Sequence, residues 1–344
     1  MAPRGLGNRV CHSTLIWRTF NLVIAARKVR TLLFVCGVLV AVMNPPSAPA
    51  IPISLSTTSG VMLGWVKEFA YSGSYTLSEL DWPVLPAFYA GATLDIGAKS
   101  GFLASIDLKL GIPTPVGTMT DSDFLNGDGV KTNFSQSDGD MEGALLLSLQ
   151  GGWGIPFEFL DGPTGTIEPF LAFEYIRLSW TAQNGYLQYP PETNAPFTPW
   201  SSSTPQVPIY GTGIMYIQNY IIPAFGVKGS LSLSQAFSFS ASLTFSPYLW
   251  CFDKDSHYFT GRDYYDSMQN GILVEPRLSA TYSISKISWV TLDVLYRHIS
   301  SLIGDVTEIT TGAYSGGQQS STFPSAGGAS LDVVDITATF TVGL

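Results

Sequence analysis

Apolar and polar residues alternate with a period of two along several long stretches of this chain. From Phe237 to Phe245 every second residue is apolar and the residues between are serine or threonine, and the pattern recurs over Phe102–Leu110, Ile272–Tyr282 and Ile336–Leu344. Successive side chains of a strand point to opposite faces, so this period predicts strands with one apolar and one polar face. A soluble β-sandwich also alternates. Long strands with an apolar, aromatic face and isolated charges opposite instead favour lipid outside and a polar lumen inside.

Short and long connections alternate between the predicted strands. Short turns are expected near residues 97–101, 154–165, 232–235 and 283–286, and long polar loops near 71–78, 113–140, 183–212, 253–270 and 304–328. Four turns and five loops separate ten strands, an even number typical of bacterial outer-membrane barrels with periplasmic turns and extracellular loops. The predicted fold class is therefore all-β: a ten-stranded antiparallel transmembrane β-barrel with long extracellular loops.

The predicted strands are longer than a membrane requires. Many alternating patterns run to about 15 residues, whereas roughly 10 residues of a tilted strand cross the bilayer. The barrel should therefore extend beyond the outer surface. A ten-stranded lumen is too narrow for an open channel, so we expect function at the raised rim and in the loops.

The first 50 residues have the form of a secretory signal peptide. Arg27, Lys28 and Arg30 precede an apolar block over Leu32–Met43, and Ala48-Pro49-Ala50 provides a small-x-small cleavage site. The apolar block is too short for a retained membrane anchor. We therefore divide the chain into a signal peptide, residues 1–50, whose start is over-extended by about 26 residues relative to the usual form, and a barrel, residues 51–344.

The charge and the cysteine content limit which classes of ligand, disulfide and cofactor are expected. Residues 1–50 hold six of the 17 Lys and Arg residues and none of the 26 Asp and Glu residues, so residues 51–344 carry 11 basic against 26 acidic residues and a net charge of −15. Such a field repels nucleic acid and attracts cationic ligands. Cys251 stands alone in residues 51–344, so no intramolecular disulfide is expected there. Because the sequence shows neither a Cys/His cluster nor a phosphate-binding loop, we expect no metal and no cofactor.

One polar stretch combines two acids with a base. Asp253, Asp255 and His257 follow one another at two-residue steps, which places them on one face of an extended backbone. A second acidic pair, Asp121 and Asp123, has the same spacing, and two carboxylates so close raise the pKa of one of them. An Asp-x-Asp in a polar loop is by itself more often a turn.

The parity of this stretch conflicts with the strand that precedes it. Odd-numbered residues from Phe237 to Leu249 form the predicted lipid-facing side. Asp253, Asp255 and His257 are also odd, so they face the lumen only if a bulge or a loop breaks the register between.

From Ile53 to Leu344 the chain resembles the omptins, which are ten-stranded outer-membrane endopeptidases. Local matches spread over most of this range carry the resemblance: Lys67-Glu68, Leu80-Asp81-Trp82, Met119–Phe124 and Asp253–Tyr258. The resemblance implies a protease in the outer membrane, with its active site on the extracellular side and cationic peptides or surface proteins as substrates.

The resemblance also implies the catalytic residues. Asp121 and Asp123 match one catalytic pair, and Asp255 and His257 match the other, across a groove at the top of the barrel. In this arrangement His257 takes a proton from water, Asp255 orients the imidazole, and the opposite pair holds the water and shares a proton. The chemistry requires no metal and no covalent nucleophile.

Specificity is implied for one side of the scissile bond. Glu68 and Asp253 match the acidic pocket that receives an arginine or lysine in omptins, and Ser137 matches a serine near the groove. Ser135 stands where the family has an acidic residue in the next subsite, which leaves the preference after the cut open.

Lipid activation is a weaker implication. Arg177 fits one basic position of the lipopolysaccharide-binding cluster of the family, but Asn219 stands where another arginine is expected. Dependence on lipopolysaccharide therefore stays open. Outer-membrane lipid around the barrel and a monomeric state are the remaining expectations.

Two alternatives come from other classes of protein. His298-Ile299-Ser300 resembles the pairing of outer-membrane lipid hydrolases, in which a lipid-facing histidine activates a serine two residues later. The other alternative is a non-catalytic adhesin or binding barrel, whose loops near 183–212 and 312–328 would bind partner molecules.

Overall fold

A computed structural model describes residues 52–97, 100–158, 163–191, 194–310 and 318–344, so the predicted signal peptide lies outside the described residues. Within this part of the chain the regular elements are strands: β1 (Ile53–Ser72), β2 (Tyr75–Gly97), β3 (Gly101–Gly111), β4 (Thr114–Asp123), β5 (Asn133–Glu158), β6 (Thr164–Gln188), β7 (Val207–Ser232), β8 (Phe237–His257), β9 (Arg262–Ser283), β10 (Ser288–Thr310) and β11 (Gln319–Gly343). The described residues contain no helix long and apolar enough to cross a membrane.

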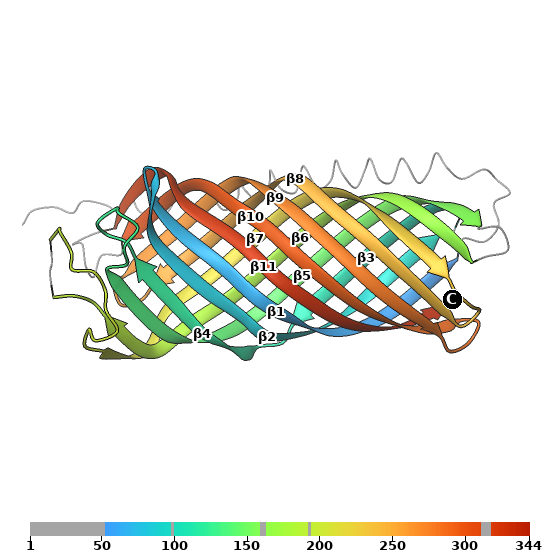
Figure 1. The fold of residues 1–344 in the computed structure, drawn as a ribbon, viewed down its shortest axis with the longest axis horizontal. Coiled ribbons are helices and arrows are strands. Elements are labelled where there is room, and N and C mark those ends of the chain that lie inside the picture. Colours follow the sequence, from blue (N-terminus) through green and yellow to red (C-terminus); the bar gives the residue numbers. More distant parts are fainter. Residues whose placement is uncertain (1–51, 98–99, 159–162, 192–193, 311–317) are drawn as a thin grey trace, which may run out of the picture. The chain divides into compact units, whose positions relative to one another are not determined.

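The strands form one closed antiparallel sheet (Figure 1). The ring closes because β1 pairs with β11 on one side and with β2 on the other. The strands β3 and β4 share a single position, since both pair with β2 and with β5. Pro113 lies in the break between them and has no N–H to donate to a ladder. The eleven strands thus occupy ten positions, and the predicted ten-stranded barrel is confirmed.

The strands continue further toward one end of the barrel than the alternation indicates. β5 to β11 each have 21 to 26 residues, and the connections at this end are residues 73–74, 124–132, 189–206, 258–261 and 311–318. The predicted loop over residues 253–270 was therefore wrong in its extent: β8 runs to His257 and β9 begins at Arg262. Polar side chains there mark the inner face of strands, not a loop. We call this end the rim.

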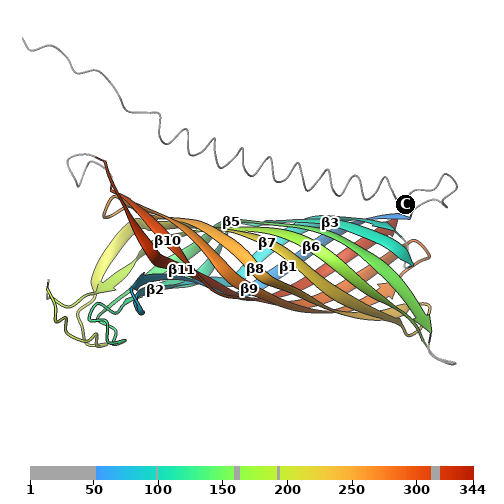
Figure 2. The ribbon, with the colours of Figure 1, turned by 90° about the horizontal axis from the view of Figure 1, so that it is seen from above.

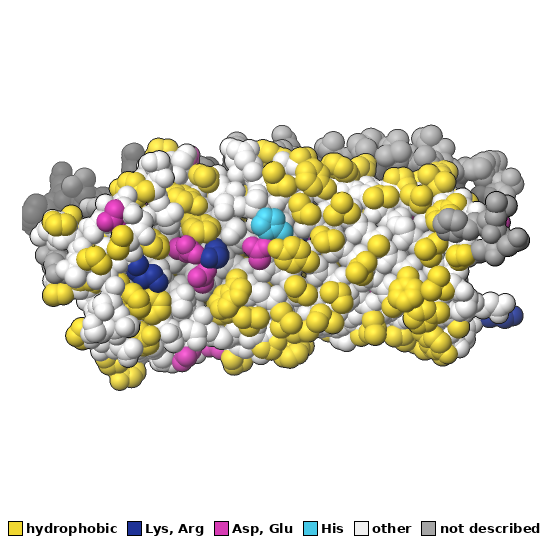
Figure 3. Space-filling view, in the orientation of Figure 1, with side chains coloured by type: hydrophobic (Ala, Val, Ile, Leu, Met, Phe, Trp, Pro, Cys, Tyr) yellow, Lys and Arg dark blue, Asp and Glu magenta, His cyan; other side chains and the backbone are white. Residues whose placement is uncertain are grey.

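The outer surface changes character along the barrel. Leu171, Leu278 and Leu292 are among the most exposed apolar side chains, at 72%, 66% and 60%, and they lie toward the end with the short turns. In Figure 3 the visible face of that half is largely apolar, and most of the charged side chains lie over the half that carries the rim. The same barrel, turned in Figure 2, has its strands inclined to the long axis. An apolar band below a polar rim is the pattern of a membrane barrel.

The lumen is filled. In its lower part Arg297 donates to Glu174 at 2.9 Å and pairs with Glu275, which satisfies buried charges against one another. Nearer the rim, Trp82, Trp180 and Tyr216 are fully buried, with ring centroids 5.1 to 6.0 Å apart. This aromatic cluster lies in the lumen beneath the rim.

Candidate active site

A register shift in β8 reverses which of its residues face inward in the half of the strand near the rim. Phe237, Phe239 and Leu243 are exposed on the outside, whereas Leu249 and the following odd-numbered residues are buried inside. The pairing with β9 shifts between Ser246 and Leu249. Ser246 is fully buried at the shift, and its Oγ donates to the carbonyl oxygens of Pro223 at 2.6 Å and Tyr248 at 2.9 Å. The break in register that the sequence required is therefore present, and Asp253, Asp255 and His257 face inward.

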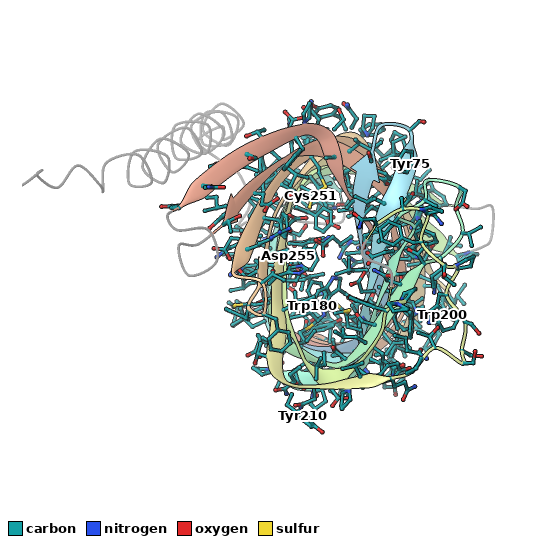
Figure 4. All side chains as sticks on the ribbon, turned by 90° about the vertical axis from the view of Figure 1, so that its left-hand side faces the viewer. Tyr75, Trp180, Trp200, Tyr210, Cys251 and Asp255 are labelled. Carbon is teal, nitrogen blue, oxygen red and sulfur yellow. The ribbon has the colours of Figure 1, made fainter. Side chains whose placement is uncertain are left out.

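Asp255 and His257 form a hydrogen-bonded pair at the end of β8. His257 Nε2 and Asp255 Oδ2 are the bonded atoms, and Asp255 lies inside the ring of strands (Figure 4). The side chain of Asp255 is 3% exposed and that of His257 is 29% exposed. Burial lowers the pKa of His257, but the charge and hydrogen bond of Asp255 and the charge of Asp121 outweigh it, so this pKa is raised. The imidazole is thus held by a buried acid, and its ring packs edge-on against Tyr264 with centroids 5.4 Å apart.

Asp121 and Asp123 stand at the rim end of β4 with neutral donors. Ser78 Oγ donates to Asp121 Oδ1 at 3.0 Å, and Asn133 Nδ2 donates to Asp123 Oδ2 at 3.0 Å. Burial, with the nearby charge of Asp123, raises the pKa of Asp121 to about 7. Burial also raises the pKa of Asp123. The pair therefore retains a proton near neutral pH.

The two pairs lie on opposing walls and interact across the lumen. The position shared by β3 and β4 is separated from β8 by three strand positions, β5, β6 and β7. The charge of His257 lowers the pKa of both Asp121 and Asp123, and Asp121 in turn contributes to the raised pKa of His257. The Asp255–His257 pair can act as a base, and the Asp121–Asp123 pair carries a proton. Both face a common space, which is the arrangement that general acid–base hydrolysis requires.

Glu68 and Asp253 belong to a buried acidic cluster beside this site. Glu68 is 8% exposed and accepts a hydrogen bond from Trp82 Nε1 at 3.2 Å, and Asp253 is 6% exposed and accepts one from Tyr216 at 2.9 Å. Burial and neighbouring carboxylates raise the pKa of both groups well above the ordinary value. Two members of the aromatic cluster, Trp82 and Tyr216, are therefore hydrogen-bond donors to these acids.

Asp266 on β9 is a third acid in this cluster, and sequence reasoning missed it. Its residue exposure is 7%, and it pairs directly with Asp253 across the β8–β9 ladder. Residues 253–270 were predicted to form a loop, and residues of a loop have no cross-strand partners. The sequence therefore offered no reason to place Asp266 beside Asp253. A short turn near residues 258–261 was the signal that would have found it.

The two serines of β5 lie on the acid-pair side of the site. Ser137 and Ser135 are both buried, and Ser135 pairs with Asp121 across the β4–β5 ladder. Tyr189 lies next to this acid pair: burial, followed by the charges of Asp121 and Asp123, raises its pKa, and Ser135 forms a hydrogen bond with it. Ser78, Asn133 and Tyr189 were not singled out in the sequence, since nothing local marks them.

The remaining candidates from the sequence lie elsewhere. His298 and Asp332 are bonded at 2.7 Å and are 42% and 48% exposed; His298 has the parity of the exposed Val294 and Tyr296 on β10, which places it on the outer face. Ser300 Oγ accepts the N–H of Ile272 at 2.9 Å. Arg177 donates to Asn219 Oδ1 at 3.2 Å between neighbouring strands β6 and β7. The structure thus places His298 with an acid and Ser300 with the backbone.

Comparison with known proteins identifies the family of this chain and solved structures with a similar fold. The model of the Omptin family matches residues 50–343. The outer membrane protease OmpT from Escherichia coli is similar over 88% of this chain and 99% of its own, with a TM-score of 0.75 and 17% identity. The translocator domain of the autotransporter NalP from Neisseria meningitidis has a TM-score of 0.30 at 9% identity, over 94% of this chain and 97% of its own. No curated protein matches in sequence.

Proposed function

Because the chain belongs to the omptin family, we propose that it is an endopeptidase of the outer membrane that cuts peptide bonds after basic residues. The observation that carries this proposal is the meeting of the Asp255–His257 pair with the proton-retaining Asp121–Asp123 pair inside the rim. The similarity of this barrel to that of OmpT, an outer membrane protease, supports the same conclusion at the level of the fold.

The proposed reaction uses water activated between the two pairs. His257 takes a proton from the water, and Asp255 holds the imidazole and stabilises its charged form. The oxygen of the water adds to the carbonyl carbon of the scissile bond. The acid pair positions the water and supplies a hydrogen bond from its shared proton, and the imidazolium then protonates the leaving amine. Neither an acyl-enzyme nor a metal takes part.

Substrate preference follows from the acidic cluster. Glu68 and Asp253 are buried carboxylates whose pKa values are raised, so an unpaired charge on either is costly. A cationic side chain placed between them would form charge-assisted hydrogen bonds and remove that cost. Ser135 and Ser137 provide neutral groups on the opposite side. We therefore assign the residue before the cut to the acidic cluster.

The site is proposed to face the outside of the cell. It lies at the rim, above the apolar band, while the short turns lie at the other end. The monomeric state stays a prediction, and dependence on lipopolysaccharide stays an open question. Adding lipopolysaccharide to protein refolded in detergent, and sizing that protein by light scattering, would measure them.

The test is cleavage of a cationic fluorogenic peptide by the refolded protein. His257→Ala and Asp121→Asn should each lower kcat/KM by ~10²- to 10⁴-fold, because each removes general acid–base assistance. Ser300→Ala is the matched control and should leave cleavage nearly intact. Release of fatty acid from phospholipid that is lost in Ser300→Ala and retained in His257→Ala would instead support the lipid hydrolase.

A further inference from the structure

Asp266 has no role in the mechanism above, although it is buried among the acids that bind the substrate. Resting on the endopeptidase function, we propose that Asp266 is a third carboxylate of the substrate-binding cluster and that the cluster thereby selects arginine over lysine before the scissile bond.

The strand register places Asp266 beside Asp253. The two residues are direct cross-strand partners on β9 and β8, and both are buried on the inner face. Side chains in that relation have Cβ atoms about 4.5 to 5.5 Å apart, and like charges there destabilise a sheet. A barrel under selection for stability alone would avoid the pairing. Buried like charges are expected where a ligand makes use of them.

The carboxylate of Asp266 lies over a glycine of β11. A Cβ on Gly327 would lie closer to Asp266 Oδ2 than any real contact allows, and it would also lie 2.9 Å from Val306 Cγ2 of β10. The Asp266 carboxylate and the Val306 side chain therefore occupy the space that a side chain at residue 327 would fill. Beyond β11 the next strand is β1, which carries Glu68.

Two oxygens of the cluster have no donor. Asp253 Oδ1 and Asp266 Oδ1 are buried and without a hydrogen-bond partner, whereas Asp253 Oδ2 accepts from Tyr216. A buried acceptor without a donor is costly. Burial and the charge of Asp255 also raise the pKa of Asp266 to about 7. A ligand that donates to both oxygens would satisfy them together and draw the carboxylates into their charged form.

The two basic side chains differ in how many carboxylates they can serve. The arginine guanidinium is a planar fork with five N–H donors, and it keeps its charge when buried. The lysine ammonium is a compact group with three donors, and its pKa falls readily on burial. Glu68, Asp253 and Asp266 come from three strands. The planar guanidinium can donate to carboxylates on several strands at once, whereas the compact ammonium cannot reach all three.

The experiment measures binding without cleavage. In a His257→Ala background, two otherwise identical peptides with arginine or lysine before the bond are titrated by calorimetry. We expect arginine to bind about tenfold more tightly, and Asp266→Asn to weaken the arginine peptide by about tenfold and the lysine peptide much less. Gly327→Ala, which displaces the Asp266 carboxylate and keeps its charge, should weaken the arginine peptide in the same direction.

The control is Asp263→Asn, three residues earlier on β9. Asp263 pairs with Lys254 at 3.4 Å, and its side chain is 29% exposed. The Asp263→Asn substitution therefore removes one carboxylate charge, as Asp266→Asn does, but outside the cluster. It should leave the arginine-to-lysine ratio unchanged.

The binding ratio alone decides this inference. A ratio that is the same with and without Asp266→Asn, or tighter binding of lysine than arginine, would overturn it. Failure of the protein with His257 intact to cleave either peptide, with the binding ratio as expected, would count against the proposed endopeptidase and not against the role of Asp266.

Discussion

The two proposed catalytic pairs differ in the partners that their carboxylates have. Asp255 is bonded to an imidazole, which can carry a positive charge, whereas Asp121 and Asp123 accept from Ser78 and Asn133, which are neutral. A neutral hydrogen-bond donor offsets the cost of burying a carboxylate charge less than a cation does. The acid pair therefore keeps a proton near pH 7, and the difference in partners assigns the base to one wall and the acid to the other.

The pH dependence of cleavage follows from these shifts. His257 must be unprotonated to act as a base, so activity rises as pH increases through its raised pKa. The acid pair must hold its proton, so activity falls as pH increases through the pKa of Asp121, about 7. We expect a narrow, bell-shaped profile of kcat/KM against pH, near neutrality. A profile that is flat from pH 5 to 9 would contradict both assignments.

Ser78→Ala should move one limb of that profile. The hydrogen bond from Ser78 lowers the pKa of Asp121. Its loss raises this pKa, so the alkaline limb should shift to higher pH, whereas the acid limb should shift less, because Asp255 contributes more than Asp121 to the pKa of His257. Ser122→Ala is the matched control on β4, since Ser122 lies between the two acids and points to the opposite face. Measurement of kcat/KM against pH for both variants checks the shift.

At the scale of the element, β8 shows what alternation can and cannot predict. The two-residue period predicted the strand and a lipid-facing side up to Leu249, which was wrong at Leu249 because this residue is fully buried. The positions of the acids required a break in register. Where the break lies, between Ser246 and Leu249, depends on contacts with β7 and β9 that no local pattern contains. The same limit hid Asp266, whose neighbour Asp253 is set by cross-strand pairing. Ser78 and Asn133 were missed for this reason too.

Ser246→Ala tests whether the break in β8 depends on its buried hydroxyl. The change removes the donor for the carbonyl groups of Pro223 and Tyr248, and a buried acceptor left unpaired costs ~1–3 kcal/mol. We expect a lower unfolding temperature in detergent, followed by the heat-dependent change of gel mobility. Cleavage should fall as well, because β8 positions Asp255 and His257. Ser240→Ala, nearer the short turn on the same strand, should change neither property as much.

At the scale of the whole molecule, strand length separates the membrane from the chemistry. Roughly 10 residues of a tilted strand cross a bilayer, and most strands here are about twice that length. The apolar outer band and the polar rim therefore belong to different halves of the same strands. The sequence indicated this division from its period and loop spacing. It underestimated the height of the rim, because inward-facing polar residues look like loop.

The net charge of the barrel should appear in the rate of substrate capture. Residues 51–344 carry a net charge of −15, and Glu68, Asp253 and Asp266 place carboxylates beside the site. A peptide with several positive charges is attracted at long range, and salt screens that attraction over about 10 Å at 0.1 M ionic strength. We expect kcat/KM for a peptide with several basic residues to fall steeply as salt rises. A peptide whose single arginine precedes the cut should lose less, because its pairing in the cluster is buried and screened less.

Glu68→Gln should reduce cleavage of both peptides at every salt concentration without removing the difference in their salt slopes. Equal slopes for the two peptides would show that the overall charge has no part in capture, and equal cleavage of neutral and cationic peptides would remove the acidic cluster from the proposed function.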